Sequence, residues 1–392
     1  MSAAWPLVAL GEVLKRADRF ESKDELSEYQ FAGTYSFGRG IFRGENKQGA
    51  SFQLPKVQRI KTDDFIYCKI MAWEGAFGLA SKDVDGCVLS GAFVAYEINR
   101  KRLDPKFIDY FFKIKSVWKN IGNKSTGTNV RRQSLHPDEF EAATIPLPPL
   151  AEQQRIVARI EELAAKIHEA RGFRQQAVEE TEALIVSYAH RYDLDSCGKL
   201  AQGWISTTLR DVVTLVQDLH KVNTDTTYPN IGIFSYARGL FKKPHIAGLQ
   251  TSATYLNRVH AGQFIYSRLF AFEGAYGMVN DEFDNYFVSN EYPTFNCNTE
   301  KVLPDFLYAY FKNPTVWKDV AVGSKGLGDR RQRVQPQQIL THRFMLPPIE
   351  YQYGLRQLMA KAGTLKQLHS ETAAELDAML PSILDKAFQG AL

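Results

Sequence analysis

The chain has 392 residues, of which 44% are hydrophobic and 12% aromatic, so it can build folded cores and is not a disordered chain. Its net charge of +4 permits nucleic-acid binding but does not prove it. The four cysteines show no metal-binding spacing, and no apolar run approaches ~18 residues. We therefore expect a soluble, cytoplasmic protein with no metal site and no membrane span.

In chain order, the first part of the sequence predicts strands and then a helix. Short apolar and aromatic runs that end in Gly, Asn or Asp predict strands within 64–70, 87–90 and 93–98. Asp104-Pro105 is typical of a helix cap and first turn, and the helix is predicted to continue to Trp118.

Two Pro-Pro pairs, Pro148-Pro149 and Pro347-Pro348, mark the ends of the two globular parts. Proline fixes φ and lacks an N–H donor, so each pair prevents a helix up to that point and allows one just after it. Apolar or small residues then recur with heptad spacing, which predicts a coiled-coil seam. In the first helix these are Ile156, Ile160, Leu163, Ile167, Ala170, Ala177, Thr181, Leu184 and Tyr188. In the second they are Leu358, Ala362, Leu365, Thr372, Leu376, Met379 and Ile383.

The chain is a tandem duplication. Phe65–Gly78 and Phe264–Gly277 match at eight of fourteen positions, with an offset of 199 residues that also relates Pro148 to Pro347. One helix leads from the first globular part to the second and the other leads back, so the two helices are predicted to pair as an antiparallel coiled coil. About 35 residues at 1.5 Å each make a rod of roughly 50 Å.

The predicted fold is therefore α+β: two related mixed α/β domains joined by two long helices. The predicted segments are a first domain over 1–146, a helix over 147–192, a second domain over 193–345 and a second helix over 346–392.

Motifs for catalysis are missing from the sequence. It contains no phosphate-binding GxxxxGK[ST] loop, no HExxH and no Asn-Pro-Pro-Tyr methyltransferase motif. Phe37-Gly-Arg-Gly40 is interpreted as a turn. Glu74 and Glu273 recur inside Glu-Gly-Ala-(Phe/Tyr)-Gly and are interpreted as turn-stabilising or DNA-facing residues rather than catalytic ones. We predict a protein with no catalytic residues and no cofactor of its own.

Two domains at a fixed separation suit duplex DNA, whose helical repeat rewards paired modules. Basic and polar residues near the end of each domain are candidate DNA contacts, because Lys and Arg neutralise phosphates and Arg and Gln read base edges. Those of the first domain are Lys124, Thr126, Asn129, Arg131, Arg132 and Gln133, and those of the second are Lys325, Arg330, Arg331, Gln332 and Arg333. Arg39 and Arg238, at equivalent positions in a second loop, are further candidates. Trp118 and Trp317 are predicted to pack in the cores.

Ile145-Pro-Leu-Pro-Pro-Leu-Ala-Glu-Gln-Gln-Arg-Ile156 and the helix after it resemble the conserved region of the specificity subunit of type I restriction-modification systems. The two-part layout of the whole chain resembles that subunit as well. The second copy departs from the signature, because Tyr351-Gln-Tyr-Gly354 stands where the first has Glu152-Gln-Gln-Arg155.

This resemblance implies a non-catalytic subunit that binds double-stranded DNA at a bipartite site with a non-specific gap. It also implies partners, namely two methyltransferase subunits and restriction subunits that move along DNA with ATP. The methyl donor and the ATP would belong to those partners. An alternative is the DNA-recognition module of another multi-subunit phage-defence or DNA-modification system. Two further alternatives belong to other functional classes. One is a nuclease or methyltransferase that acts without partners, and the other is a coiled-coil adaptor with no role in DNA binding.

Overall fold

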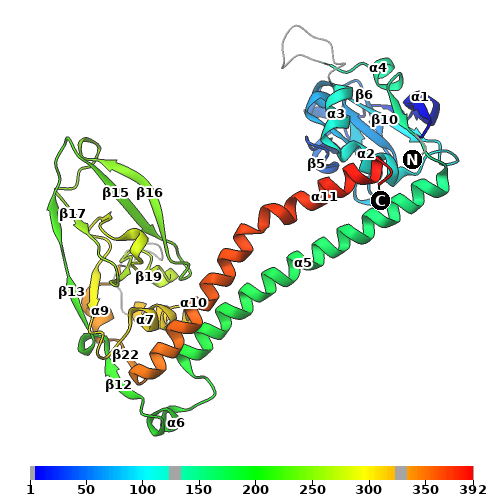
Figure 1. The fold of residues 1–392 in the computed structure, drawn as a ribbon. Coiled ribbons are helices and arrows are strands. Elements are labelled where there is room, and N and C mark those ends of the chain that lie inside the picture. Colours follow the sequence, from blue (N-terminus) through cyan, green and yellow to red (C-terminus); the bar gives the residue numbers. More distant parts are fainter. Residues whose placement is uncertain (1–4, 123–133, 323–332, 392) are drawn as a thin grey trace. The chain divides into compact units, whose positions relative to one another are not determined.

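The computed structural model describes residues 5–122, 134–322 and 333–391. The chain divides into two compact units (Figure 1). Unit 1 comprises Met1–Gly172 and Thr372–Leu392, and unit 2 comprises Phe173–Glu371. Each unit thus combines one globular part with a portion of both helical stretches.

The described residues of unit 1 form three small sheets. The strands β1 (Leu7–Ala9) and β11 (Thr144–Pro146) pair antiparallel and join the two ends of the globular part. A four-stranded sheet has the order β2 (Leu14–Arg16), β10 (Phe93–Ile98), β7 (Phe65–Cys68), β8 (Phe77–Leu79). A five-stranded sheet has the order β3 (Phe20–Ser22), β6 (Lys56–Arg59), β9 (Val88–Leu89), β4 (Glu28–Thr34), β5 (Ile41–Gln48).

Unit 2 repeats this topology strand for strand. Its two-stranded pair is β12 (Ile205–Thr208) with β22 (Arg343–Leu346). The four-stranded sheet has the order β13 (Val213–Val216), β21 (Thr294–Cys297), β18 (Phe264–Tyr266), β19 (Tyr276–Met278). The five-stranded sheet has the order β14 (Leu219–Lys221), β17 (Tyr255–Arg258), β20 (Phe287–Val288), β15 (Thr227–Ile233), β16 (Leu240–Ala247). In both units the central short strand pairs parallel with its long neighbour, β9 with β4 and β20 with β15. The duplication inferred from the sequence is therefore a duplication of fold.

Helices complete each globular part. Unit 1 has α1 (Leu10–Val13), α2 (Pro105–Lys113), α3 (Lys115–Gly122) and α4 (Pro137–Glu141). Unit 2 has α6 (Ser196–Ala201), α7 (Pro304–Tyr310), α8 (Pro314–Ala321) and α9 (Pro336–Thr341). Asp104 caps α2 as predicted, because its side chain accepts hydrogen bonds from the backbone N–H groups of Lys106 and Phe107. The predicted single helix to Trp118 is wrong in one respect, since extended backbone at Ile114 separates α2 from α3.

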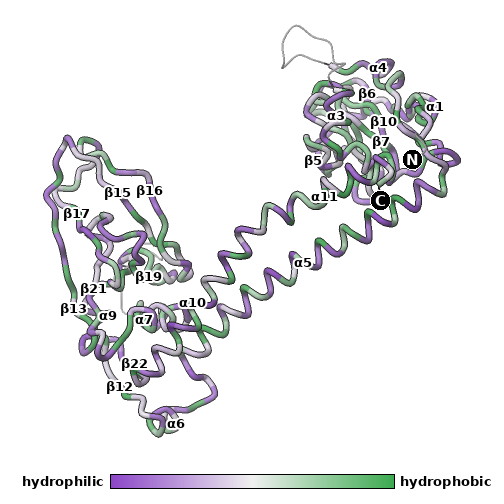
Figure 2. The backbone as a smooth tube through the Cα atoms, in the orientation of Figure 1, coloured by the Kyte–Doolittle hydropathy of each residue, from purple (hydrophilic) through white to green (hydrophobic). Residues whose placement is uncertain are grey.

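The long helices pair antiparallel within each unit. Helix α5 (Leu150–His190) starts directly after Pro149, as predicted, and the return stretch forms α10 (Ile349–Glu371) and α11 (Ala373–Phe388). In unit 1 an ion pair of 2.7 Å joins Arg171 of α5 to Asp377 of α11. In unit 2 Lys366 of α10 pairs with Glu182 of α5. Hydrophobic and hydrophilic residues alternate along these helices (Figure 2), and the predicted α+β class with an antiparallel helix pair is confirmed.

Details of the helical seam differ from the heptad prediction. Leu184 is 53% exposed, whereas its neighbour Ile185 is buried in the core of unit 2. Met379 is 47% exposed, and the next predicted position, Ile383, is only partly buried, whereas its neighbour Leu384 is buried in the core of unit 1. The return stretch is also two helices rather than one, with a break at Thr372. Because an ideal helix has 3.6 residues per turn, a strict seven-residue pattern drifts, and the buried position moves by one residue over several turns.

A buried glutamine fixes the start of each long helix. Gln153 is 0% exposed. Its Oε1 accepts from the Asp104 N–H at 2.8 Å, and its Nε2 donates to the carbonyls of Arg102 and Pro148, both at 2.8 Å. The side chain therefore ties the Pro-Pro joint to the loop before α2.

Gln352 is equally buried and repeats these bonds in unit 2. Its Oε1 accepts from the Leu303 N–H, and its Nε2 donates to the carbonyls of Lys301 and Pro347. The signature therefore keeps in both copies the residue that makes the joint, while Glu152 and Arg155 form an ion pair at the surface of the first copy alone.

Two histidines of unit 2, His190 and His342, are partly buried and have a lowered pKa, and no described histidine of unit 1 shares this. Burial lowers the pKa of His190 and of His342 from the ordinary value of 6.5. The His190 ring bonds to the Tyr310 carbonyl at 3.0 Å, and the His342 ring bonds to the Tyr310 hydroxyl at 3.0 Å. The positions equivalent to Tyr310 and His342 in unit 1 are Phe111 and Ala143.

This difference predicts an acid sensitivity confined to unit 2. The unfolded chain takes up protons at these histidines more readily than the folded one. The free energy of unfolding of unit 2 is therefore highest above pH 6.5 and decreases as the pH falls below it. In thermal unfolding between pH 7.5 and 5.5, we expect the melting of unit 2 to move down while that of unit 1 stays. The double variant His190→Gln with His342→Gln should flatten this dependence, and equal movement of both units would contradict the assignment.

No described helix is long and apolar enough to cross a membrane. Within the described ranges, His, Cys, Asp and Glu side chains form no group of three or more that could hold a metal ion.

Candidate nucleic-acid interface

One exposed loop has the same form in both units. Tyr35–Gly40 connects β4 to β5, and Phe234–Gly239 connects β15 to β16. In both loops the order of residues is aromatic, Ser, aromatic, Gly or Ala, Arg, Gly. We call them the arginine loops.

Each arginine loop is bonded to the repeated Glu-Gly turn. In unit 1 Ser36 Oγ donates to Glu74 Oε2 at 3.0 Å, the Phe37 N–H donates to the Glu74 carbonyl, and the Gly38 N–H donates to the Gly75 carbonyl. In unit 2 the same three bonds run from Ser235, Tyr236 and Ala237 to Glu273 and Gly274. Glu74 and Glu273 thus stabilise a turn, the first of the roles predicted for them.

The turn itself depends on its glycine and on a tryptophan. Gly75 and Gly274 have φ of 79° and 80°, and a Cβ built on them would lie 2.6 and 2.4 Å from the indoles of Trp118 and Trp317. Only glycine meets both conditions without strain. Trp118 and Trp317 are buried, as predicted.

The arginine of each loop is held in one orientation. Arg39 Nε donates to the Ser36 carbonyl at 3.0 Å, and its guanidinium lies 5.3 Å from the ring centroid of Tyr35. Arg238 Nε donates to the Ser235 carbonyl at 3.1 Å, and its guanidinium lies 5.0 Å from the ring centroid of Phe234.

Both arginines are exposed, and neither pairs with a carboxylate in the part of the chain that the structure describes. The bond at Nε fixes the plane of the fork and leaves the terminal nitrogens with no hydrogen-bond partner among the described residues. Such a fork can donate two parallel hydrogen bonds to a guanine edge or to a phosphate.

Most of the other predicted DNA-contacting residues lie outside the described residues. These are Lys124, Thr126, Asn129, Arg131, Arg132, Gln133, Lys325, Arg330, Arg331 and Gln332. Arg333 is described. It is exposed and forms an ion pair of 3.1 Å with Glu291, which also pairs with Arg268 at 3.0 Å. Arg333 is thus already neutralised, whereas Arg39 and Arg238 are not.

The described residues that border 123–133 lie against the element that holds the arginine loop. A Cβ on Gly122 would lie 2.6 Å from the Cα of Trp73, and the Leu135 N–H donates to the Lys69 carbonyl at 2.9 Å. Both partners belong to the 3₁₀ turn Lys69–Glu74. The corresponding Val334 N–H in unit 2 donates to the Arg268 carbonyl. In unit 1 the described residues on either side of 123–133 therefore both contact the turn that holds the arginine loop.

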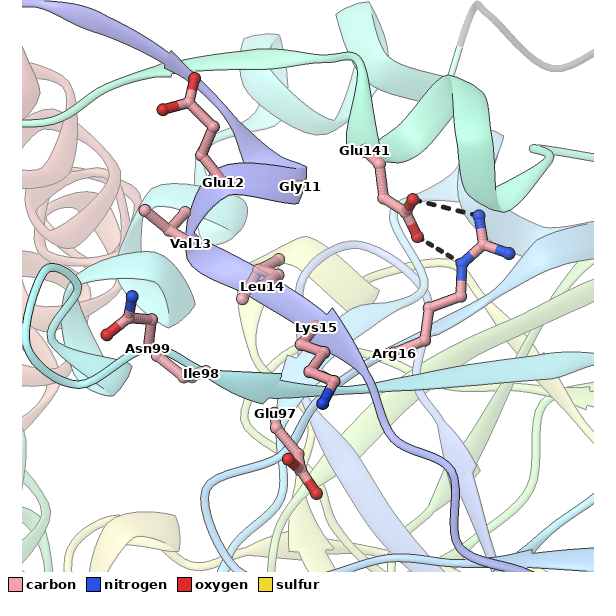
Figure 3. A pocket seen from close by; sticks show the side chains of 10 residues that line it. All are labelled: Gly11, Glu12, Val13, Leu14, Lys15, Arg16, Glu97, Ile98, Asn99 and Glu141. Atoms are coloured by element: carbon pink, nitrogen blue, oxygen red, sulfur yellow. Dashed lines mark hydrogen bonds and ion pairs between the residues drawn. The ribbon is translucent and has the colours of Figure 1, made fainter.

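A separate cavity of about 650 Å³ in unit 1 is less suited to an anion (Figure 3). Glu12, Glu97 and Glu141 line it, and its Arg16 is already bonded to Glu141 at 2.5 Å and to Asp138. These carboxylates raise the pKa of Arg16, so its charge is internally balanced. The arginine loops remain the best candidate interface.

Sequence reasoning identified the arginine loops but missed the residues that hold one of them. In unit 2 the Tyr308 hydroxyl donates to the Ala237 carbonyl at 3.0 Å. Lys312 Nζ lies 3.4 Å from the same carbonyl and pairs with Glu182 of α5 at 2.7 Å. Unit 1 has Asp109 at the position of Tyr308. The repeat therefore carried no signal for the Tyr308 contact, although Lys113 stands at the position of Lys312.

Comparison with known proteins gives one consistent family. Residues 3–177 match the type I restriction modification DNA specificity domain. The specificity subunit of the type I restriction enzyme EcoKI from Escherichia coli K12 is 23% identical over 77% of this chain and 68% of its own length. The StySPI specificity subunit from Salmonella potsdam is 22% identical over the same shares.

Solved structures with the same fold cover the whole chain. The HsdS subunit from Thermoanaerobacter tengcongensis matches 100% of this chain and 98% of its own with a TM-score of 0.58 at 21% identity. A chain from work on complex assembly and conformational transition of the type I R-M system matches 100% and 99% with a TM-score of 0.65 at 21% identity. These findings confirm the resemblance that the sequence predicted: the chain is similar to the specificity subunits of type I restriction-modification systems.

Proposed function

We propose that this chain is the non-catalytic DNA-recognition subunit of a type I restriction-modification complex and reads a bipartite site. The observation that carries the proposal is the arginine loop, present in the same form in both units with an exposed, oriented and unneutralised guanidinium. Each unit reads one half-site by contacts to base edges, and the bases between the half-sites are not read.

The four predicted segments take separate roles in this proposal. The domains over 1–146 and 193–345 recognise double-stranded DNA. The helices over 147–192 and 346–392 set the length of the unread gap and dock two methyltransferase subunits, and restriction subunits join that assembly. Methyl transfer and ATP hydrolysis belong to these partners.

The proposal predicts a methylated DNA motif with a fixed gap. The chain would be expressed in a methylation-free host together with the methyltransferase encoded beside its gene, and modified bases would be located by single-molecule sequencing. We expect one motif made of two half-sites, absent when the chain is omitted. Because the arginine loops are alike, we also expect the half-sites to share sequence character and to form an interrupted, partly palindromic site.

The chain expressed alone is the control for catalysis. Methylation or cleavage by the chain alone would refute a non-catalytic role. A motif without a gap would refute bipartite reading, and two unrelated half-sites would refute the expected likeness of the halves.

A further inference from the structure

Each arginine loop contains one aromatic residue in a strained backbone conformation. Phe37 has φ of 67° and Tyr236 has φ of 62°, in the left-handed region that side chains disfavour. They are the two aromatic residues with positive φ in the described ranges, and they occupy equivalent positions of the duplication. Strain kept at the same place in both units indicates a role for that conformation.

Burial does not account for these rings. Phe37 is 60% exposed and Tyr236 is 65% exposed. Each has one described ring neighbour, Trp118 at 6.2 Å and Trp317 at 6.3 Å between centroids. A glycine would adopt this φ without strain, as Gly38 does beside Phe37, so the fold itself does not require an aromatic ring here.

The loops are also built to be stiff. The N–H groups of Phe37 and Tyr236 donate to the carbonyls of Glu74 and Glu273, each at 2.7 Å. On the far side of the arginine, Tyr35 packs on Phe42 at 4.4 Å and Phe234 packs on Phe241 at 4.2 Å between centroids. Each loop therefore presents an exposed ring, a guanidinium and a supported second ring from a backbone that cannot easily yield.

We propose that Phe37 and Tyr236 are wedge residues, each of which enters between two neighbouring base pairs of its half-site and stacks on an exposed base. This inference rests on the proposed function. Unstacking a base step costs free energy, and a stiff loop can impose that cost on DNA where a mobile loop would give way. An apolar wedge of this kind kinks a duplex, and the adjacent arginine fork can contact a base edge next to the kink.

The test begins with a DNA probe chosen by the protein. The full-length chain selects duplexes from a random library, and the selected duplex is then made with 2-aminopurine at each adenine in turn. Stacking between neighbouring bases quenches 2-aminopurine, so a ring that separates two base pairs raises its fluorescence severalfold at one step in each half-site. Energy transfer between dyes at the duplex ends reports the kink independently.

Variants separate the wedge from a structural role. Phe37→Ala removes the ring and leaves a side chain too short to enter between base pairs. At saturating protein it should abolish the fluorescence rise in one half-site and weaken binding roughly 5- to 150-fold. Tyr236→Ala should do the same in the other half-site. Phe37→Tyr should retain the signal, whereas Phe37→Gly should abolish it while leaving the melting temperature unchanged or higher, because it relieves the strain.

Phe173→Ala is the matched control, since Phe173 is 62% exposed on helix α5 outside both loops, and it should change neither signal. A library that yields no preferred sequence would contradict the proposed function and the wedge together. A selected duplex that binds without any fluorescence rise or kink, or a rise that persists in Phe37→Ala, would overturn the wedge alone. If replacing thymine by uracil abolished binding and neither a fluorescence rise nor a kink were seen, the ring would contact a thymine methyl group. That result would overturn the wedge proposal as well.

Discussion

Arg39→Ala should relax recognition in one half-site and leave the other half-site unchanged. Arg238→Ala should have the reverse effect. A bidentate contact from arginine to a guanine is worth about 1–3 kcal/mol of discrimination against a wrong base, so we expect roughly a 5- to 150-fold loss of preference at one base pair. Binding to a library of single-base substitutions in the selected duplex, measured at one fixed salt concentration, would locate the affected position.

Arg39→Lys distinguishes the contribution of the paired guanidinium hydrogen bonds from that of the positive charge. Lysine keeps the positive charge but cannot bond to the Ser36 carbonyl through a planar Nε and cannot donate in parallel pairs. We expect Arg39→Lys to lose discrimination nearly as fully as Arg39→Ala, while keeping more of the binding to unrelated duplex DNA. Arg100→Ala is the matched control, because Arg100 is exposed and already bonded to Asp63 at 2.6 Å. Equal weakening of both half-sites by Arg39→Ala would contradict its assignment to a single half-site.

The duplication and the joints were predictable because their signals are local or periodic. An offset of 199 residues relates the strand order, the Trp118 and Trp317 positions and the arginine loops of the two units. Proline has the same effect on backbone geometry in any protein, so the starts of α5 and α10 follow from the Pro-Pro pairs.

What could not be predicted depends on contacts between distant segments. Gln153 looks like any polar residue of a helix, and its burial arises only when the loop at Arg102–Asp104, about fifty positions earlier, folds onto the joint. The seam buries Ile185 rather than the predicted Leu184, and this depends on the local pitch of two packed helices. The strain at Phe37 follows from its bonds to the Glu74 turn, a contact that neither segment signals by itself.

The largest loss of stability is expected from Gln153→Ala and Gln352→Ala. Each substitution removes three hydrogen bonds from a fully buried site and leaves one N–H and two carbonyls without these partners. An unsatisfied buried group costs about 1–3 kcal/mol, so a loss of at least ~3 kcal/mol is expected, out of a typical total of about 5–15 kcal/mol for a domain. Urea unfolding followed by circular dichroism would measure it, and the transition of unit 1 should move with Gln153→Ala and that of unit 2 with Gln352→Ala.

Exposed glutamines on the same helices provide the controls. Gln154 directly follows Gln153, and Gln357 lies one and a half turns after Gln352, so their alanine variants change the same residue type without touching a joint. We expect changes within about 0.5 kcal/mol for both. Gln153→Glu tests the chemistry, because a carboxylate of nearly the same shape cannot donate to the carbonyls of Arg102 and Pro148 and would bury a charge. If Gln153→Glu or Gln153→Ala proved as stable as Gln154→Ala, the joint would be held by the Pro-Pro backbone and the β1–β11 pairing alone.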